Sequence, residues 1–174
     1  MYLRILLHFI SLCLLVIIQL AILPHLPWSL SYLNIIIVAL IFSLVFLDFN
    51  WSAGWWLTVG WLLGLFSFSN FINWIIIMTV IFLFSYWLLI NFFTNRSLYS
   101  LLLLTGIALI INDLGLYGLN YLTAKIQGSS ILALDSSFWL LELQRLTVNL
   151  ILVIVLFYIF NIISYRFRPV LRKN

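Results

Sequence analysis

Charged residues are the scarcest class in this sequence. Only 7% of its 174 residues are Asp, Glu, Lys or Arg, whereas 66% are hydrophobic. Soluble domains have about 25% charged and roughly 45–50% apolar residues, so a soluble surface cannot be built here. The composition therefore predicts an integral membrane protein of one domain. We attribute the net charge of +4 to contacts with lipid headgroups and to membrane topology. We therefore expect membrane lipids as partners and no nucleic acid.

Cysteine and histidine are too few for several kinds of site. Cys13 is the single cysteine, which excludes an internal disulfide. His8 and His25 have neither a cysteine pair nor an acidic cluster beside them, which is not the spacing of a metal site. The sequence also lacks a phosphate-binding glycine loop and a nucleophile elbow. We therefore expect no enzymatic activity, no catalytic residue, no cofactor and no metal.

Long apolar runs are abundant. About 20 apolar residues are needed to cross the bilayer core. Such runs recur here between short polar turns and after Pro24 and Pro27, which end a helix. We predict an all-α polytopic bundle of six transmembrane helices in one domain, 1–174. The predicted spans are about 3–23, 31–47, 51–68, 71–93, 98–122 and 138–165. Five spans remain an alternative, in which the second and third form one re-entrant unit.

The distribution of basic residues predicts the orientation, because cytoplasmic loops are enriched in Lys and Arg. With six spans both termini lie on one side, and the opposite side holds Lys125 in a loop and Arg145 within a span. The side with the termini carries Arg4, Arg96, Arg166, Arg168, Arg172 and Lys173. We therefore expect both termini in the cytoplasm. The same bias favours an even number of spans.

Three ionisable residues within the last two spans form the main candidate site. Asp113 lies about nine residues before the exterior end of the fifth span, and Arg145 about seven residues into the sixth. At about 1.5 Å per residue the two have similar depths and can pair. Glu142 shares the helix face of Arg145 at i, i+3. Inserting an ionisable side chain into the centre of a membrane span costs roughly 2.5–3.5 kcal/mol, so each of these residues needs a polar partner or a water-filled cavity. Three roles stay open for this cluster: a structural lock, a ligand or partner site, and a proton or ion relay.

Small and uncharged polar residues predict how the helices pack. Gly60 and Gly64 are spaced i, i+4, which permits close approach of another helix, either within the bundle or from a partner. In the fifth span, Gly106, Gly115 and Gly118 indicate an irregular exit end. Amide side chains in lipid are expected to hydrogen-bond across helices. The amides considered are Gln19, Asn34, Asn73, Asn91, Asn112, Asn120, Gln144, Asn149 and Asn161.

Four stretches of the sequence carry a family resemblance. They are QLAILPHLP at 19–27, SYLNIIIVAL at 31–40, GWLLGLFSFSNF at 60–71 and NFFTNRSLYSLLLL at 91–104. The chain resembles the rod shape-determining protein MreD family as a divergent member. Where that family commonly has an acidic residue after its glycine pair, this chain has Ser67 and Phe68.

The resemblance implies a non-enzymatic scaffold in the bacterial cytoplasmic membrane. Such a scaffold associates with MreC-type proteins and other elongation-complex subunits, and helps to coordinate cell shape and peptidoglycan synthesis with MreB filaments. It also implies a fold like that of the substrate-binding S components of energy-coupling-factor transporters.

The alternative function is that of an S component of an energy-coupling-factor vitamin transporter. Asp113, Glu142 and Arg145 would then contribute to an exterior-facing substrate pocket. The first span, SLCLLVIIQLAIL at 11–23, lacks the alanine pair with which those proteins typically dock to their coupling subunit. A third alternative is an unrelated small membrane protein of lipid handling or quality control.

Overall fold

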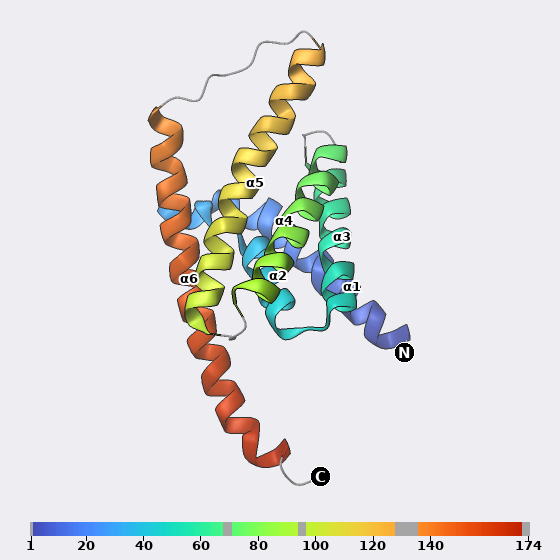
Figure 1. Ribbon diagram of the computed structural model, residues 1–174, viewed down its shortest axis with the longest axis vertical. Coiled ribbons are helices and arrows are strands. Elements are labelled where there is room, and N and C mark those ends of the chain that lie inside the picture. The colour runs from blue at the N-terminus through green and yellow to red at the C-terminus, as the bar shows by residue number, and fades with distance from the viewer. Residues whose placement is uncertain (1, 68–70, 94–96, 128–135, 172–174) are drawn as a thin grey trace.

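The chain is built from helices that pack side by side (Figure 1). The structure is a computed structural model and describes residues 2–67, 71–93, 97–127 and 136–171. Every regular element in these ranges is helical. The α-helices are α1 (Tyr2–Ile17), α2 (Ile35–Phe46), α3 (Phe49–Phe66), α4 (Phe71–Asn91), α5 (Leu98–Gln127) and α6 (Ser136–Leu171).

Among the described residues, four segments are long and apolar enough to cross a membrane: Leu6–His25, Phe71–Asn91, Leu98–Gln127 and Phe138–Ile162. These segments agree with the prediction of an all-α membrane protein, and its count of six spans stays a prediction. The 12 residues of α2 are about 18 Å long, short of a bilayer core of about 30 Å. The 18 residues of α3 are less apolar because they include three glycines and four tryptophans.

The first predicted span is a composite of three helix types. After α1 ends at Ile17, a π-helical turn, η1 (Ile18–Ile22), is followed by a 3₁₀ turn, η2 (Leu23–His25). A second 3₁₀ turn, η3 (Trp28–Tyr32), precedes α2, which begins at Ile35 and not at residue 31 as predicted. Asn34 explains this start, because its Oδ1 caps the helix by accepting a hydrogen bond from the Ile37 N–H at 3.2 Å.

The prediction of an irregular exit from the fifth span is wrong. One continuous α-helix runs from Leu98 to Gln127, five residues beyond the predicted end at 122. A helix keeps its backbone groups paired in lipid, which outweighs a glycine cost of about 1 kcal/mol per residue. Gly115 faces the side chain of Ile77 on α4, so this glycine permits close packing there.

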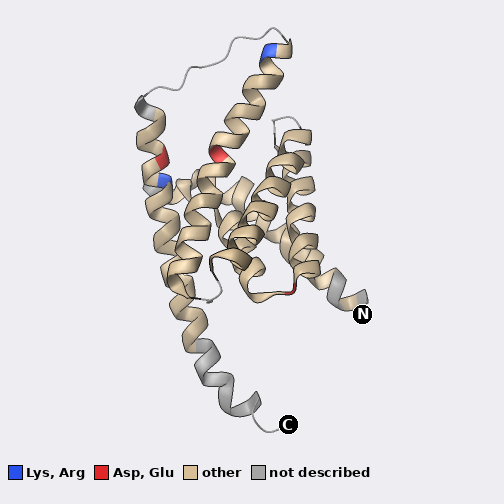
Figure 2. Ribbon diagram, viewed as in Figure 1, with Lys and Arg blue, Asp and Glu red and all other residues tan. Residues whose placement is uncertain are grey.

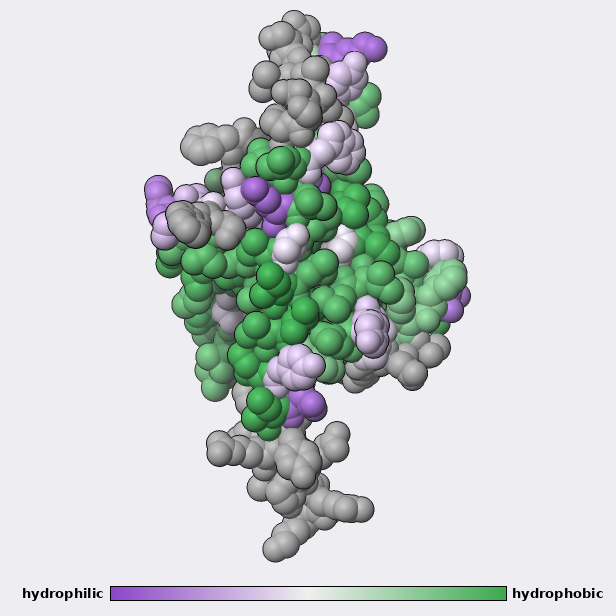
Figure 3. Space-filling view, turned by 90° about the vertical axis from the view of Figure 1, so that its left-hand side faces the viewer, coloured by the Kyte–Doolittle hydropathy of each residue, from purple (hydrophilic) through white to green (hydrophobic). Residues whose placement is uncertain are grey.

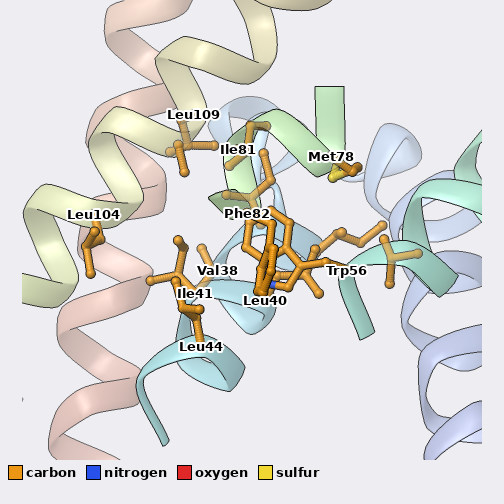
Figure 4. Packing of buried hydrophobic residues seen from close by; sticks show 14 of the residues in the cluster. Val38, Leu40, Ile41, Leu44, Trp56, Met78, Ile81, Phe82, Leu104 and Leu109 are labelled. Atoms are coloured by element: carbon orange, nitrogen blue, oxygen red, sulfur yellow. The ribbon is translucent and has the colours of Figure 1, made fainter. Parts of the chain in front are cut away.

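The apolar core lies between α2, α3, α4 and α5 (Figure 4). Trp56 of α3 and Phe82 of α4 pack at a ring-centroid distance of 5.8 Å. Ile41 of α2 and Leu104 of α5 are completely buried. Eight of the 12 residues of α2 are buried, so this short helix is surrounded by protein and need not span lipid alone.

The outermost helices are α1 and α6. In an apolar window of 18 residues, 17% of the residues are buried in Leu6–His25 and 11% in Phe138–Ile162, compared with 33% in the segments of α4 and α5. In Figure 1, α6 forms one edge of the bundle and its C-terminal end projects beyond the other helices. The face shown in Figure 3 is dominated by hydrophobic residues.

The structure does not test the predicted orientation, because most of the basic residues behind that prediction lie outside its described part. These are Arg96, Arg172 and Lys173, and the side chains of Arg4, Arg166 and Arg168.

Candidate functional site

A polar cavity of about 310 Å³ lies where the irregular segment η1–η3 meets α2, α5 and α6. Its polar lining comes from separate parts of the chain, which only the fold brings together. We call it the polar cavity and define it by its polar lining residues. These are Gln19, Ser31, Tyr32, Asn34, Asn112, Asp113 and Arg145.

An ion cluster of Asp113, Glu142 and Arg145 adjoins the polar cavity. The Arg145 Nη1 lies 2.6 Å from the Asp113 Oδ2, and the side chains are 37% and 9% exposed, respectively. Glu142 is 7% exposed. Its carboxyl group is within hydrogen-bonding reach of that of Asp113. In Figure 2, acidic and basic positions of α5 and α6 face one another across the gap between the two helices.

The structure therefore brings the three predicted ionisable residues together, with one difference in detail. The sequence predicted that Asp113 pairs with Arg145 and that Glu142 shares the helix face of Arg145. In the structure, Asp113 contacts both Arg145 and Glu142. The guanidinium thus pairs with Asp113, which is the central residue of the cluster.

Gln19 holds the irregular segment next to the cavity. Its Nε2 donates to the Leu33 carbonyl, and its Oε1 accepts from the Ile35 N–H, both at 2.9 Å. Irregular backbone is tolerated at membrane depth only where protein or a water-filled cavity satisfies its polar groups. The side chain of Gln19 thus replaces backbone hydrogen bonds that no regular helix supplies between η3 and α2.

Asn149 of α6 fastens the same segment from the opposite side. Its Oδ1 accepts from the Asn34 N–H at 2.7 Å, and its Nδ2 donates to the Tyr32 carbonyl at 3.1 Å and the Arg145 carbonyl at 2.8 Å. The residue is fully buried. Sequence reasoning placed Asn149 among nine amides that bond across helices. It could not identify this one as the link between α6 and the cavity wall, because its partners are backbone atoms 115 and 117 residues away.

Some acceptor atoms at the site have no hydrogen-bond partner. Asn112 is 3% exposed, and its Nδ2 donates to the Asp113 Oδ1 at 2.8 Å, but its own Oδ1 has no partner. Glu142 Oε1 is also buried without one. Asp113 Oδ2 contacts Arg145 as an ion pair without the alignment of a hydrogen bond. Buried polar groups are nearly always hydrogen-bonded, so these acceptors favour a donor from outside the chain.

The predicted glycine pair belongs to a different part of the bundle. A Cβ at Gly60 would lie 3.2 Å from the Met78 Cβ, and one at Gly64 would lie 2.6 Å from the Phe71 ring. Both glycines thus face α4. Among the described residues, no group of three or more His, Cys, Asp and Glu side chains could hold a metal ion.

Comparison with known proteins adds no further identification. The chain matches no family model, no curated protein and no solved structure.

Proposed function

We propose that this chain is a non-enzymatic scaffold subunit of the bacterial cell-elongation machinery, a divergent relative of the MreD family. It would regulate cell shape and peptidoglycan synthesis through MreC-type partners in the cytoplasmic membrane. In this proposal all six helices belong to a bundle of S-component type, with both termini in the cytoplasm. Support comes from the resemblance and from one structural observation, the uncovered face of α6.

That face is a continuous exposed stripe, which we call the α6 stripe. Its members follow one another at three- and four-residue steps, the spacing of one helix face. They are Leu140, Gln144, Thr147, Ile151, Val155, Tyr158 and Ile162, and all are exposed. The stripe covers the length of the apolar part of α6, Phe138–Ile162.

Gln144 makes the α6 stripe more than a lipid-facing surface. Its amide can donate two hydrogen bonds and accept others, and lipid tails supply no partner. Polar side chains of this type join transmembrane helices. Thr147, one turn further on, already bonds the Leu143 carbonyl at 2.8 Å. A helix of an MreC-type partner seated on the stripe would satisfy Gln144 and cover the adjacent apolar residues.

The glycine pair of α3 does not compete for this role. Gly60 and Gly64 already face α4. The proposal therefore places the partner surface on a peripheral helix, and α6 is the least buried of the four long apolar segments.

Site-specific photocrosslinking in the native membrane tests the proposal. A photoreactive amino acid at Ile151 or Val155, which are 56% and 47% exposed, should capture an MreC-type protein or another elongation-complex subunit. The same amino acid at Val153, which is fully buried between them, is the matched control and should capture none. Mass spectrometry identifies the product. If the exposed positions yield only lipid adducts, the α6 stripe is not a partner surface.

The polar cavity favours a second function, that of an S component of an energy-coupling-factor transporter. Transporter binding sites commonly combine interrupted helices with polar groups near the middle of the membrane. Here η1–η3 interrupt the helical path beside Asp113 and Arg145. Purification in mild detergent separates the two functions. Paired ATPase subunits with a coupling membrane subunit would support transport and contradict the scaffold function.

A further inference from the structure

We propose that the polar cavity binds a small organic ammonium ligand, either a soluble amine or the ethanolamine headgroup of a phospholipid. This inference goes beyond the scaffold function and does not depend on it. It rests on the charge balance of the ion cluster, on an unpartnered buried acceptor and on the lining of the cavity.

Acidic groups outnumber basic groups in the ion cluster. It contains two carboxyl groups and one guanidinium, so it either carries one excess negative charge or holds a proton between the two carboxyl groups, which lie within hydrogen-bonding reach of each other. Lys125 is the only other Lys or Arg whose side chain the structure describes. It lies 12 residues beyond Asp113 on α5, about 18 Å along the helix. Buried charges need a partner, and an ammonium group in the cavity would balance the second carboxylate in place of that proton.

The cavity wall presents hydrogen-bond acceptors without donors. Asn112 lines the cavity, is 3% exposed, and has an Oδ1 without a hydrogen-bond partner. Asp113 Oδ2 adds a second acceptor that only the Arg145 ion pair contacts. A primary ammonium has three donors and no acceptor. It therefore complements a wall that presents acceptors.

The rest of the cavity wall is aromatic and apolar. Tyr32 and Trp74 line the cavity together with the apolar side chains of Leu63, Met78 and Leu116. Aromatic faces attract ammonium groups within about 6 Å of the ring. A cavity of about 310 Å³ is at the lower end of the roughly 300–1,000 Å³ typical of ligand sites. It accommodates one compact amine with a short apolar body.

The test compares two probes that match in shape and differ in charge. Isothermal titration of the full-length protein in detergent micelles uses 2-phenylethylamine and its neutral analogue 2-phenylethanol. We expect the amine to bind at least tenfold more tightly than the alcohol. Equal affinities, or no binding of the amine, would overturn the proposal, and this comparison needs no variant.

A matched pair of variants locates the site. Asn112→Leu removes the free acceptor at nearly constant size and should weaken amine binding at least tenfold. Asn73→Leu removes another buried amide, which bonds Asn120 at 2.8 Å and does not line the cavity, and should leave binding unchanged. Equal loss in both variants would contradict binding in the polar cavity.

Two lipids distinguish the sources of the ammonium group. If lysophosphatidylethanolamine competes with 2-phenylethylamine and the control lysophosphatidylglycerol does not, the ligand is a lipid headgroup. Competition by free ethanolamine alone identifies a soluble amine. Either result supports the proposal, whereas equal competition by both lysolipids contradicts recognition of the ammonium group. None of these readings depends on the crosslinking of α6, so the two proposals can fail separately.

Discussion

At the scale of single residues, Asp113 organises the candidate site. It contacts Arg145, Glu142 and Asn112, and it lines the polar cavity. Equal depth in antiparallel helices was enough to predict its pairing with Arg145. The contact between Asp113 and Glu142 was not predictable, because it depends on the rotation of α5 and α6 about their own axes. Helical spacing determines which residues share a face but leaves open how two such faces meet.

Replacing Asp113 should destabilise the bundle. In Asp113→Asn the guanidinium of Arg145 loses its partner. We expect a loss of about 1–3 kcal/mol, less than for a fully buried pair because Arg145 is 37% exposed. Unfolding by dodecyl sulfate in mixed micelles, followed by tryptophan fluorescence, measures this loss.

The double variant Asp113→Leu/Arg145→Leu is the control for this prediction. Removing both charges leaves no unpaired ion, so we expect it to be at least as stable as Asp113→Asn. If the double variant is clearly less stable than Asp113→Asn, the ion pair adds net stability to the fold and does more than neutralise two buried charges. Unchanged stability in the single variant would show that the ion pair has no structural role.

At the scale of helices, composition and length were predictable and interruptions were not. The bounds of the helices α3 and α4 agree within two residues with the predicted segments 51–68 and 71–93. The π turn at Ile18–Ile22 has no distinct sequence signal, since the residues there are as apolar as those of α1. Its Gln19 side chain bonds the backbone of Leu33 and Ile35, two partners that are known only from the fold. Sequence reasoning recognised the amide as a cross-helix donor but not the segment that it would hold.

The contact of α3 with α4 gives a prediction at the same scale. An added Cβ at Gly64 would come within 2.6 Å of the Phe71 ring and 3.0 Å of its carbonyl oxygen, so one of the helices must shift. Overpacking of this kind costs about 1–3 kcal/mol. Gly64→Ala should therefore lower the unfolding midpoint in dodecyl sulfate.

Gly54→Ala, on the same helix, is the matched control. No atom lies within 4 Å of its added Cβ, and alanine favours a helix over glycine by about 1 kcal/mol. We expect this variant to be at least as stable as the natural chain. Equal destabilisation by both substitutions would mean that the close packing of α3 on α4 is not the cause.

At the scale of the whole molecule, composition was sufficient to predict a helical membrane protein. It was not sufficient to count the helices that cross the membrane, because length and apolarity alone identify four. The other two helices, α2 and α3, are joined through Leu47 and Asp48 and pack against each other. A helix surrounded by protein does not need the length or apolarity of one surrounded by lipid. The number of spans therefore depends on burial, which the sequence does not reveal.

The orientation of the molecule can be measured at the two ends of α5. Tyr99 and Ile126 are 78% and 86% exposed and are separated by 27 residues, about 40 Å along the helix. In a Cys13→Ala background, Ile126→Cys should react with an impermeant maleimide added to intact cells, since the end of α5 is predicted to be exterior. Tyr99→Cys should react only after the cells are opened.

Other labelling patterns have distinct meanings. The reverse pattern would place the termini outside and contradict the orientation predicted from the basic residues. Reaction of both cysteines in intact cells would show that α5 does not cross the membrane, despite its 30 helical residues. The expected pattern would place the end of α5 that lies beyond Asp113 on the exterior side. An amine arriving from outside the cell would then reach the polar cavity through the exterior leaflet.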